Sequence, residues 1–249
     1  MSTWFNSVDI YCERLDPSFW AEPINAISNL SFIVAGFFIW RLRSPHSALM
    51  ATLMILIGLG SFSFHTFANR LTGLLDVVAI ALYLVAFAFL IAKQWSRSSL
   101  LIQMGSVLLL IVSIVLAHLL MSHLKPALPW MPPGIYLGAW VALFIYALVT
   151  QYSNASAARF LWLAMIVFPF SLLSRQLDIP LCDSIGATHW LWHLLNGLTL
   201  YWSSYGLCTE QHSKLNWFLV LFQKRENSEY SLTKIITKYS SRQHPIELS

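Results

Sequence analysis

Four ionisable side chains lie at the ends of long apolar segments: His65, Asp76, His189 and His193. Such groups are costly in apolar surroundings unless their burial is compensated, and a metal ion can compensate it. His189 and His193 are four residues apart, so on a helix both imidazoles lie on one face, one turn apart. With His65 they make three nitrogen ligands, a set typical of catalytic zinc, which keeps its fourth position open. The sequence therefore predicts a split zinc site.

Two side chains near these ligands suit reaction chemistry. Zinc lowers the pKa of a bound water to about 7, and Asp76 could accept a proton from that water and return it to a leaving group. Ser61 lies one helical turn before His65 and could donate a hydrogen bond to an oxyanion or hold the water. Any one intramembrane histidine taken singly is more typical of a packing residue than of a ligand. The combination favours a zinc hydrolase.

The elements that must position these residues are membrane-length segments. The chain of 249 residues is 57% hydrophobic and 10% charged, whereas soluble globular chains are roughly 25% charged. This composition excludes a soluble domain of ordinary surface and indicates a multi-pass integral membrane protein. The net charge of +4 does not indicate a nucleic-acid partner, because the basic residues lie in short loops and in the tail.

We predict an all-α fold, a bundle of seven transmembrane helices. Seven continuous apolar stretches approach the roughly 20 residues that a spanning helix needs, and they do not alternate as the strands of a membrane barrel do. In lipid a helix satisfies its own backbone hydrogen bonds, so we expect long apolar runs to form helices. The predicted spans are residues 25–43, 48–67, 74–93, 99–121, 133–150, 157–175 and 187–207.

These spans divide the chain into an N-terminal segment (1–24), a membrane domain (25–207) and a C-terminal tail (208–249). With seven spans the two termini lie on opposite sides, and Lys and Arg are distributed eleven against four between the sides. The positive-inside rule then places the N-terminus outside and the C-terminus in the cytosol. All four ionisable residues fall at a similar depth near the outer side. The four outer basic residues are Arg14, Arg70, Lys125 and Arg175.

An acidic cluster precedes the first span. Its members are Asp9, Glu13, Asp16 and Glu22, with Asn25 close behind. Carboxylates and amide oxygens around a tight segment suit a hard cation such as calcium. From the spacing alone, a solvated acidic segment explains the cluster equally well.

The chain has three cysteines and no CxxC pair, so a thiolate zinc knuckle is not indicated. Cys12 and Cys182 both fall on the predicted outer side, where compartment and topology permit a disulfide. The alternative is two free thiols. Cys208 lies near the inner end of the last span, and we expect it to stay reduced.

In three segments the chain resembles the alkaline ceramidase family, within a superfamily of seven-helix membrane hydrolases that also holds the adiponectin and progestin receptors. The motifs that carry the resemblance are SxxxH (Ser61 and His65), an aspartate in the following span (Asp76) and HxxxH (His189 and His193). Their combination is far more specific than any one of them. The short loops and modest tail are more similar to bacterial members, which implies the bacterial inner membrane, or an endomembrane in a eukaryote. The segments are DIYCERLDPSFWAEPINAISNLSF (9–32), GSFSFHTFANRLTGLLDVVAI (60–80) and THWLWHLLNGLTLY (188–201).

The resemblance implies zinc bound by His65, His189 and His193, with Ser61 and Asp76 acting next to it. The implied reaction is hydrolysis of the amide of ceramide, or of a similar N-acyl lipid, to a long-chain base and a fatty acid. The implied partners are this lipid substrate and the surrounding membrane lipids.

For the N-terminal segment the resemblance implies a calcium site and a disulfide between Cys12 and Cys182. Glu13 and Glu22 lie in the segments that match the family and are the implied calcium ligands. The tentative set is completed by Asp9, Asp16 and Asn25.

Two other classes of protein are compatible with parts of the pattern. A seven-helix receptor could keep the zinc and the fold with little hydrolysis, but a purely structural metal needs neither Ser61 nor Asp76. A proton-coupled transporter would have polar residues through the depth of several spans, whereas residues 99–150 are almost bare of ionisable groups. The sequence does not indicate an oligomeric state.

Overall fold

The protein is all-helical in its computed structural model. Within the described residues the only strand-like pairing is an isolated bridge between Ser7 and Asn69. This confirms the predicted fold class. The predicted C-terminal tail, apart from Cys208, lies outside the described residues. The structure describes residues 3–95, 99–127 and 131–208.

Six helices of the described chain are long and apolar enough to cross a membrane. The described chain also has a helix over residues 189–208, and its role as a seventh span stays a prediction. Two short helices, η1 (Thr3–Phe5) and α8 (Cys182–Ile185), lie outside the six. The six are α1 with α2 (Pro23–Ser28, Leu30–Trp40), α3 (Ser47–Phe67), α4 with η2 (Arg70–Ile91, Ala92–Gln94), α5 (Leu100–Leu124), α6 (Gly134–Ser153) and α7 (Ala155–Leu177).

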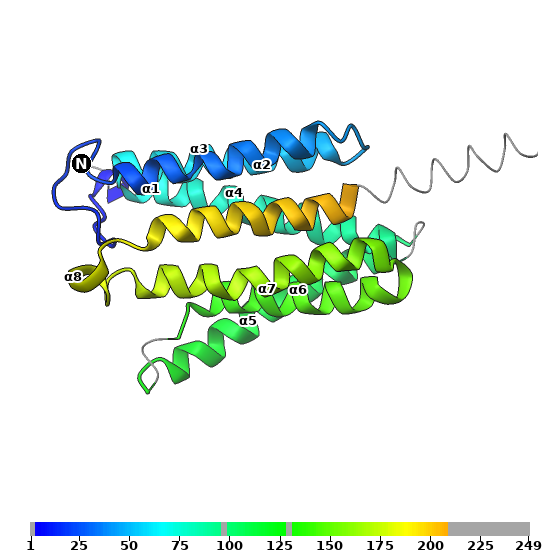
Figure 1. Cartoon of the computed structure of the whole chain (residues 1–249). Coiled ribbons are helices and arrows are strands. Elements are labelled where there is room, and N and C mark those ends of the chain that lie inside the picture. Colours follow the sequence, from blue (N-terminus) through cyan, green and yellow to red (C-terminus); the bar gives the residue numbers. More distant parts are fainter. Residues whose placement is uncertain (1–2, 96–98, 128–130, 209–249) are drawn as a thin grey trace, which may run out of the picture. The chain divides into compact units, whose positions relative to one another are not determined.

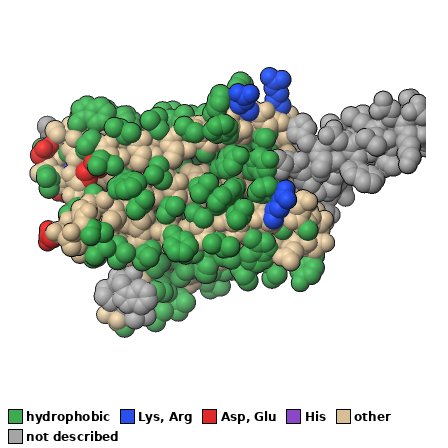
Figure 2. Space-filling view, viewed as in Figure 1, with side chains coloured by type: hydrophobic (Ala, Val, Ile, Leu, Met, Phe, Trp, Pro, Cys, Tyr) green, Lys and Arg blue, Asp and Glu red, His purple; other side chains and the backbone are tan. Residues whose placement is uncertain are grey.

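The outer surface of these helices is apolar, whereas several polar side chains are inside. On α5, Leu101 is 85% exposed and Leu116 is 61% exposed, while Ser61 and His65 of α3 are buried. Exposed apolar surface of this extent marks contact with a membrane. In Figure 2 hydrophobic side chains cover the flank of the molecule, and acidic and basic side chains lie at opposite ends of it. The distribution agrees with a multi-pass membrane protein.

Helices that follow one another in the chain pack side by side, α2 on α3, α3 on α4, α5 on α6 and α6 on α7. The helix 189–208, yellow to orange in Figure 1, runs beside both α2 and α7. Its Gly197 lies against Ser31 of α2, and its Gly206 lies against Ala157 of α7. This helix therefore brings its two histidines between the first and the second halves of the bundle.

Two glycines let α6 approach α5 closely. A Cβ atom built on Gly138 would lie 2.4 Å from the Cα of Ile114, and one built on Gly134 would lie 2.4 Å from the carbonyl oxygen of Ala117. Glycines four residues apart are a common device for close helix packing in membranes, because they remove side-chain bulk from one face. The α5–α6 contact thus depends on the absence of these two side chains.

The helix α4 begins at Arg70, four residues before the predicted span. Asn69 forms a capping box with Thr72: the Asn69 side chain accepts a hydrogen bond from the Thr72 N–H, and the Thr72 side chain is within reach of the Asn69 N–H. Such a box satisfies backbone N–H groups that the first turn leaves free. As a result Asp76 lies in the second turn of α4, not at its start.

Candidate metal centre

Three histidines from two helices converge at one point. His65 lies near the end of α3, and His189 and His193 occupy the first two turns of the helix 189–208. Each is only 1% exposed, and one ligand nitrogen from each lies within 4.8 Å of those of the other two. The structure therefore brings together the three predicted ligands, and the group could hold a metal ion.

Hydrogen bonds on the far side of two rings set which nitrogen faces the centre. The Nδ1 of His65 lies 2.6 Å from Glu22 Oε2 and donates to that carboxylate. The hydroxyl of Ser28 donates to the carbonyl of Asn25 at 2.8 Å, so it accepts from the Nδ1 of His193, 2.7 Å away. In the neutral imidazoles both Nδ1 atoms then carry the proton, which leaves both Nε2 atoms with free lone pairs.

The unprotonated nitrogens face one another, which fits a metal ion. The Nε2 atoms of His65 and His193 are 3.2 Å apart, and neither ring has a proton left to donate across that gap. The buried Nδ1 of His189 has no hydrogen-bond partner among the described residues. Buried polar atoms left unpaired are costly, and imidazoles held from behind by a carboxylate or hydroxyl are the usual arrangement of metal ligands.

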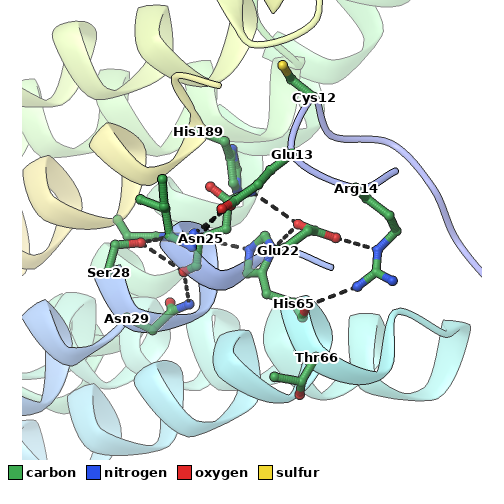
Figure 3. A network of polar contacts seen from close by, with 12 residues as sticks. Cys12, Glu13, Arg14, Glu22, Asn25, Ser28, Asn29, His65, Thr66 and His189 are labelled. Carbon is green, nitrogen blue, oxygen red and sulfur yellow. Dashed lines mark hydrogen bonds and ion pairs between the residues drawn. The ribbon is translucent and has the colours of Figure 1, made fainter. Parts of the chain in front are cut away.

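Glu22 is itself held in place by several donors. Arg14 donates to its Oε1 and Asn25 donates to its Oε2, which also accepts from His65 (Figure 3). Burial alone would raise the pKa of Glu22, but the hydrogen bonds from His65, Arg14 and Asn25 hold this pKa below its usual value. The carboxylate is therefore ionised and directed at His65.

Tyr11 covers the histidines from the N-terminal segment. Its ring stacks on that of His189, with centroids 3.8 Å apart and planes at 23°, and it lies 5.2 Å from the ring of His65. Burial raises the pKa of Tyr11, so the phenol is neutral. No motif in the sequence marks Tyr11, although its neighbour Cys12 lies in the pair for which a disulfide is predicted.

Asp178 connects the N-terminal segment to the histidine helix. Its Oδ1 accepts hydrogen bonds from the N–H groups of Thr188 and His189, at 2.8 and 2.9 Å. Its Oδ2 accepts from the N–H of Cys12 at 2.8 Å. An acidic side chain at the start of a helix satisfies free N–H groups there and suits the positive end of the helix dipole. This 1% exposed carboxylate fixes the backbone that carries His189.

A disulfide joins the same two regions covalently. Cys12 and Cys182 are bonded, with Cα atoms 5.5 Å apart, which confirms that predicted pair. Cys208 is free and buried. The disulfide and Asp178 together hold Tyr11 over the three histidines.

Ser61 and Asp76 lie on the wall of a cavity that also reaches the histidines. We call it the site cavity; it is lined by Ser61, Asp76, His189 and His193 at one end. A Cβ atom on Gly60 would lie 3.2 Å from the Cα of Asp76, so the glycine lets α4 approach α3 beside Ser61. The Oδ1 of Asp76 is buried and has no partner within the described part of the chain. The carboxylate is thus available to a ligand.

The rest of the site cavity is mainly apolar and extends between the helices. One cation, Arg175 of α7, also lines it, with its guanidinium 5.2 Å from the ring centroid of Tyr136 and 5.8 Å from that of Trp192. In the sequence Arg175 is predicted only as an outer basic residue, and no signal there indicates its place on the cavity. The apolar lining includes Phe32, Ile57, Leu84, Phe87, Leu110 and Leu143.

The predicted calcium ligands do not gather around an open position. Both carboxylate oxygens of Glu13 accept backbone N–H groups, from residues 24 and 25 at 2.7 and 2.8 Å. Glu22 is engaged as described above, and Asp9 and Asp16 are exposed. Of the set, the Oδ1 of Asn25 is buried without a partner among the residues described. Calcium takes six to eight oxygen ligands, and the residues as placed do not fit it.

A family model described as Ceramidase matches residues 11–219, a region that includes all three histidines, Ser61 and Asp76. No curated protein and no solved structure matches the chain.

Proposed function

Because the chain belongs to the ceramidase family, we propose that it hydrolyses the amide bond of ceramide or a similar N-acyl lipid, with zinc as cofactor. The products are a fatty acid and a long-chain base. The observation that carries the proposal is the convergence of three histidines, two of which line a mainly apolar cavity together with Asp76, a carboxylate with one buried oxygen that has no partner among the described residues. A receptor of the same fold would need no such carboxylate.

The ion would be held by His65, His189 and His193, because these nitrogen donors suit zinc in three-ligand catalytic sites. When bound, zinc acidifies water and polarises a carbonyl group. The hydrogen bonds from Glu22 and Ser28 keep the two Nδ1 atoms protonated and so leave nitrogen lone pairs for the ion.

Asp76 is the proposed proton carrier. Its Oδ1 faces no protein donor within the described chain, so it can take a proton from the attacking water and deliver it to the nitrogen of the departing amine. Ser61 lies on the same wall and can donate its hydroxyl proton to the amide oxygen as negative charge develops there. These roles divide the reaction between side chains of α3 and α4, two helices that approach each other closely at Gly60.

The apolar wall is the proposed site for the hydrocarbon chain. Phe87, Leu110 and Leu143 line the site cavity away from the histidines, and burial of apolar chain against them stabilises binding by about 0.8 kcal/mol per methylene. Such a wall also excludes water from the reacting amide. Arg175, on the same cavity, is placed to attract the carboxylate of the fatty acid product.

The proposed topology has seven spans, with the histidines near the outer side and the C-terminus in the cytosol. The helix 189–208 is 20 residues long, which suffices for the hydrocarbon core of a bilayer. The separation of acidic and basic side chains in Figure 2 supports this orientation.

The proposal is tested by metal content and fatty acid release on the same purified sample. We expect the wild-type protein to contain zinc and to cleave ceramide. Asp76→Asn should keep its zinc and lose most of its turnover, whereas His193→Ala should lose both. Zinc without fatty acid release, across a panel of N-acyl lipids, would favour a receptor. Normal turnover by Asp76→Asn would show that the assigned proton carrier is wrong.

A further inference from the structure

Arg14 is a buried arginine whose guanidinium binds three oxygen atoms. It donates to a carboxylate oxygen of Glu22, to the carbonyl of Asp16 at 3.2 Å and to the carbonyl of His65 at 3.0 Å. Its exposed fraction is 6%. One carboxylate and two carbonyl oxygens are the ligand types that a calcium ion prefers. In this protein the guanidinium of Arg14 supplies the positive charge among these oxygens.

We propose that Arg14 is a positioning residue that replaces a calcium ion in the N-terminal segment. Its guanidinium supplies the charge that holds Glu22 against His65, so this segment needs no bound cation. The proposal concerns the metal centre of the proposed function and therefore rests on it.

The hydrogen bonds of the two glutamates of the segment support this assignment. Glu13 uses both carboxylate oxygens on the backbone at the start of α1. The second oxygen of Glu22 is occupied by His65 and Asn25. A calcium ion would have to displace Arg14 from Glu22, and the displaced guanidinium would then be a buried charge without its carboxylate, which is strongly unfavourable.

The chemistry of arginine suits this position. A guanidinium stays protonated at all relevant pH values, and its planar fork can reach several acceptors at once. Its bond to the His65 carbonyl lies at the last turn of α3, where free carbonyl groups and the helix dipole favour a positive charge. Arg14 therefore fixes His65 twice, through its backbone and through Glu22 behind its imidazole (Figure 3).

The first test is the response of the wild-type protein to calcium. The thermal midpoint of purified full-length protein is measured after treatment with a calcium chelator and again with 1 mM calcium. A stabilising ion at 100 times its dissociation constant would contribute about 2.7 kcal/mol, a shift that is easily measured. We expect the two midpoints to coincide. A calcium-dependent rise would overturn the proposal.

The second test separates charge from packing at position 14. Arg14→Met keeps a long apolar stem without charge, and Arg14→Lys keeps the charge. Zinc affinity is measured by chelator competition, and retention of the Cys12–Cys182 disulfide is checked by mass spectrometry. We expect a loss of affinity of about tenfold in Arg14→Met, in the range seen when groups behind metal ligands are removed. Arg14→Lys should recover most of it.

The matched control is Arg70→Met, which removes an exposed arginine at the start of α4 and should leave zinc affinity unchanged. Equal zinc affinity of Arg14→Met and the wild type, or equal losses in Arg14→Met and Arg14→Lys, would overturn the role of the charge. A wild-type protein that binds no zinc would refute the proposed function, and the calcium measurement would still decide the assignment of Arg14.

Discussion

Asp178 accepts a hydrogen bond from the backbone N–H of His189 at 2.9 Å, and the same carboxylate accepts one from Cys12. One buried side chain thus sets the start of the histidine helix and the position of the segment above it. A substitution at Asp178 therefore affects both the start of the histidine helix and the N-terminal segment.

We therefore expect Asp178→Asn to remove one of these two contacts. An amide has one acceptor oxygen in place of two, so either Cys12 or the helix start loses its partner. The cost should be about 1–3 kcal/mol, as for other buried unsatisfied groups. It is measured as a lower thermal midpoint together with lower zinc affinity. Asp183→Asn, in the short helix α8, is the control, and equal behaviour of the two variants would contradict this role.

Glu22→Gln should lower zinc affinity by about 10- to 100-fold, because the amide is a poorer acceptor for the Nδ1 proton of His65. Glu13→Gln is its matched control, since Glu13 accepts only backbone N–H groups at the start of α1. That control should lose stability while its zinc affinity stays within about threefold of wild type, a loss of under 1 kcal/mol of binding energy. Chelator competition on both variants distinguishes the roles. Equal losses of affinity would mean that Glu22 supports the fold only.

Two serines of the first span contact His193 differently. The hydroxyl of Ser28 accepts from the ring at Nδ1, whereas the hydroxyl of Ser31 donates to the backbone carbonyl. We expect Ser28→Ala to reduce zinc affinity about tenfold and Ser31→Ala to leave it nearly unchanged. Zinc titration of the two variants provides the comparison. The reverse order would place the orienting contact at Ser31.

We expect the stability of the protein to depend on the close approach of α5 and α6. In Gly138→Ala the new methyl group would meet Ile114 at 2.4 Å, and overpacking of this kind typically costs 1–3 kcal/mol. In Gly105→Ala nothing lies within 4 Å of the new atom, and alanine is the better helix former. Thermal midpoints should fall in the first variant and hold or rise in the second. Identical midpoints would mean that α6 can move away from α5 at little cost.

The convergence of the three histidines could be predicted because the rules that locate them are local. Four-residue spacing puts His189 and His193 on one helix face. The long apolar runs predict the helices, and the direction of each helix through the membrane places His65 at the same depth as these two residues. Placing the start of α4 required more than hydropathy. Arg70 and Thr72 lower the apolarity of its first turn, so the polar capping box was excluded from the predicted span.

The N-terminal segment could not be predicted to the same degree. It has no helical or strand period, so nothing in its sequence indicates which residues fold back onto the bundle. In the sequence Arg14 has the pattern of an outer loop charge, and no motif marks Tyr11. For Glu22 the family resemblance implies calcium, but a carboxylate can equally accept hydrogen bonds from side chains. Only the folded chain shows that His65 and Arg14 are the ones in reach.

The disulfide between Cys12 and Cys182 has a consequence for biogenesis. Disulfides persist in oxidising compartments and are rare in the cytosol. If the bundle were inserted with the opposite orientation, both thiols would stay reduced, and the covalent link that holds Tyr11 and Arg14 over the histidines would be missing. Under the proposed topology, the redox state of this one pair therefore reports the orientation of the inserted chain, in the same segment that places Tyr11 against the histidines.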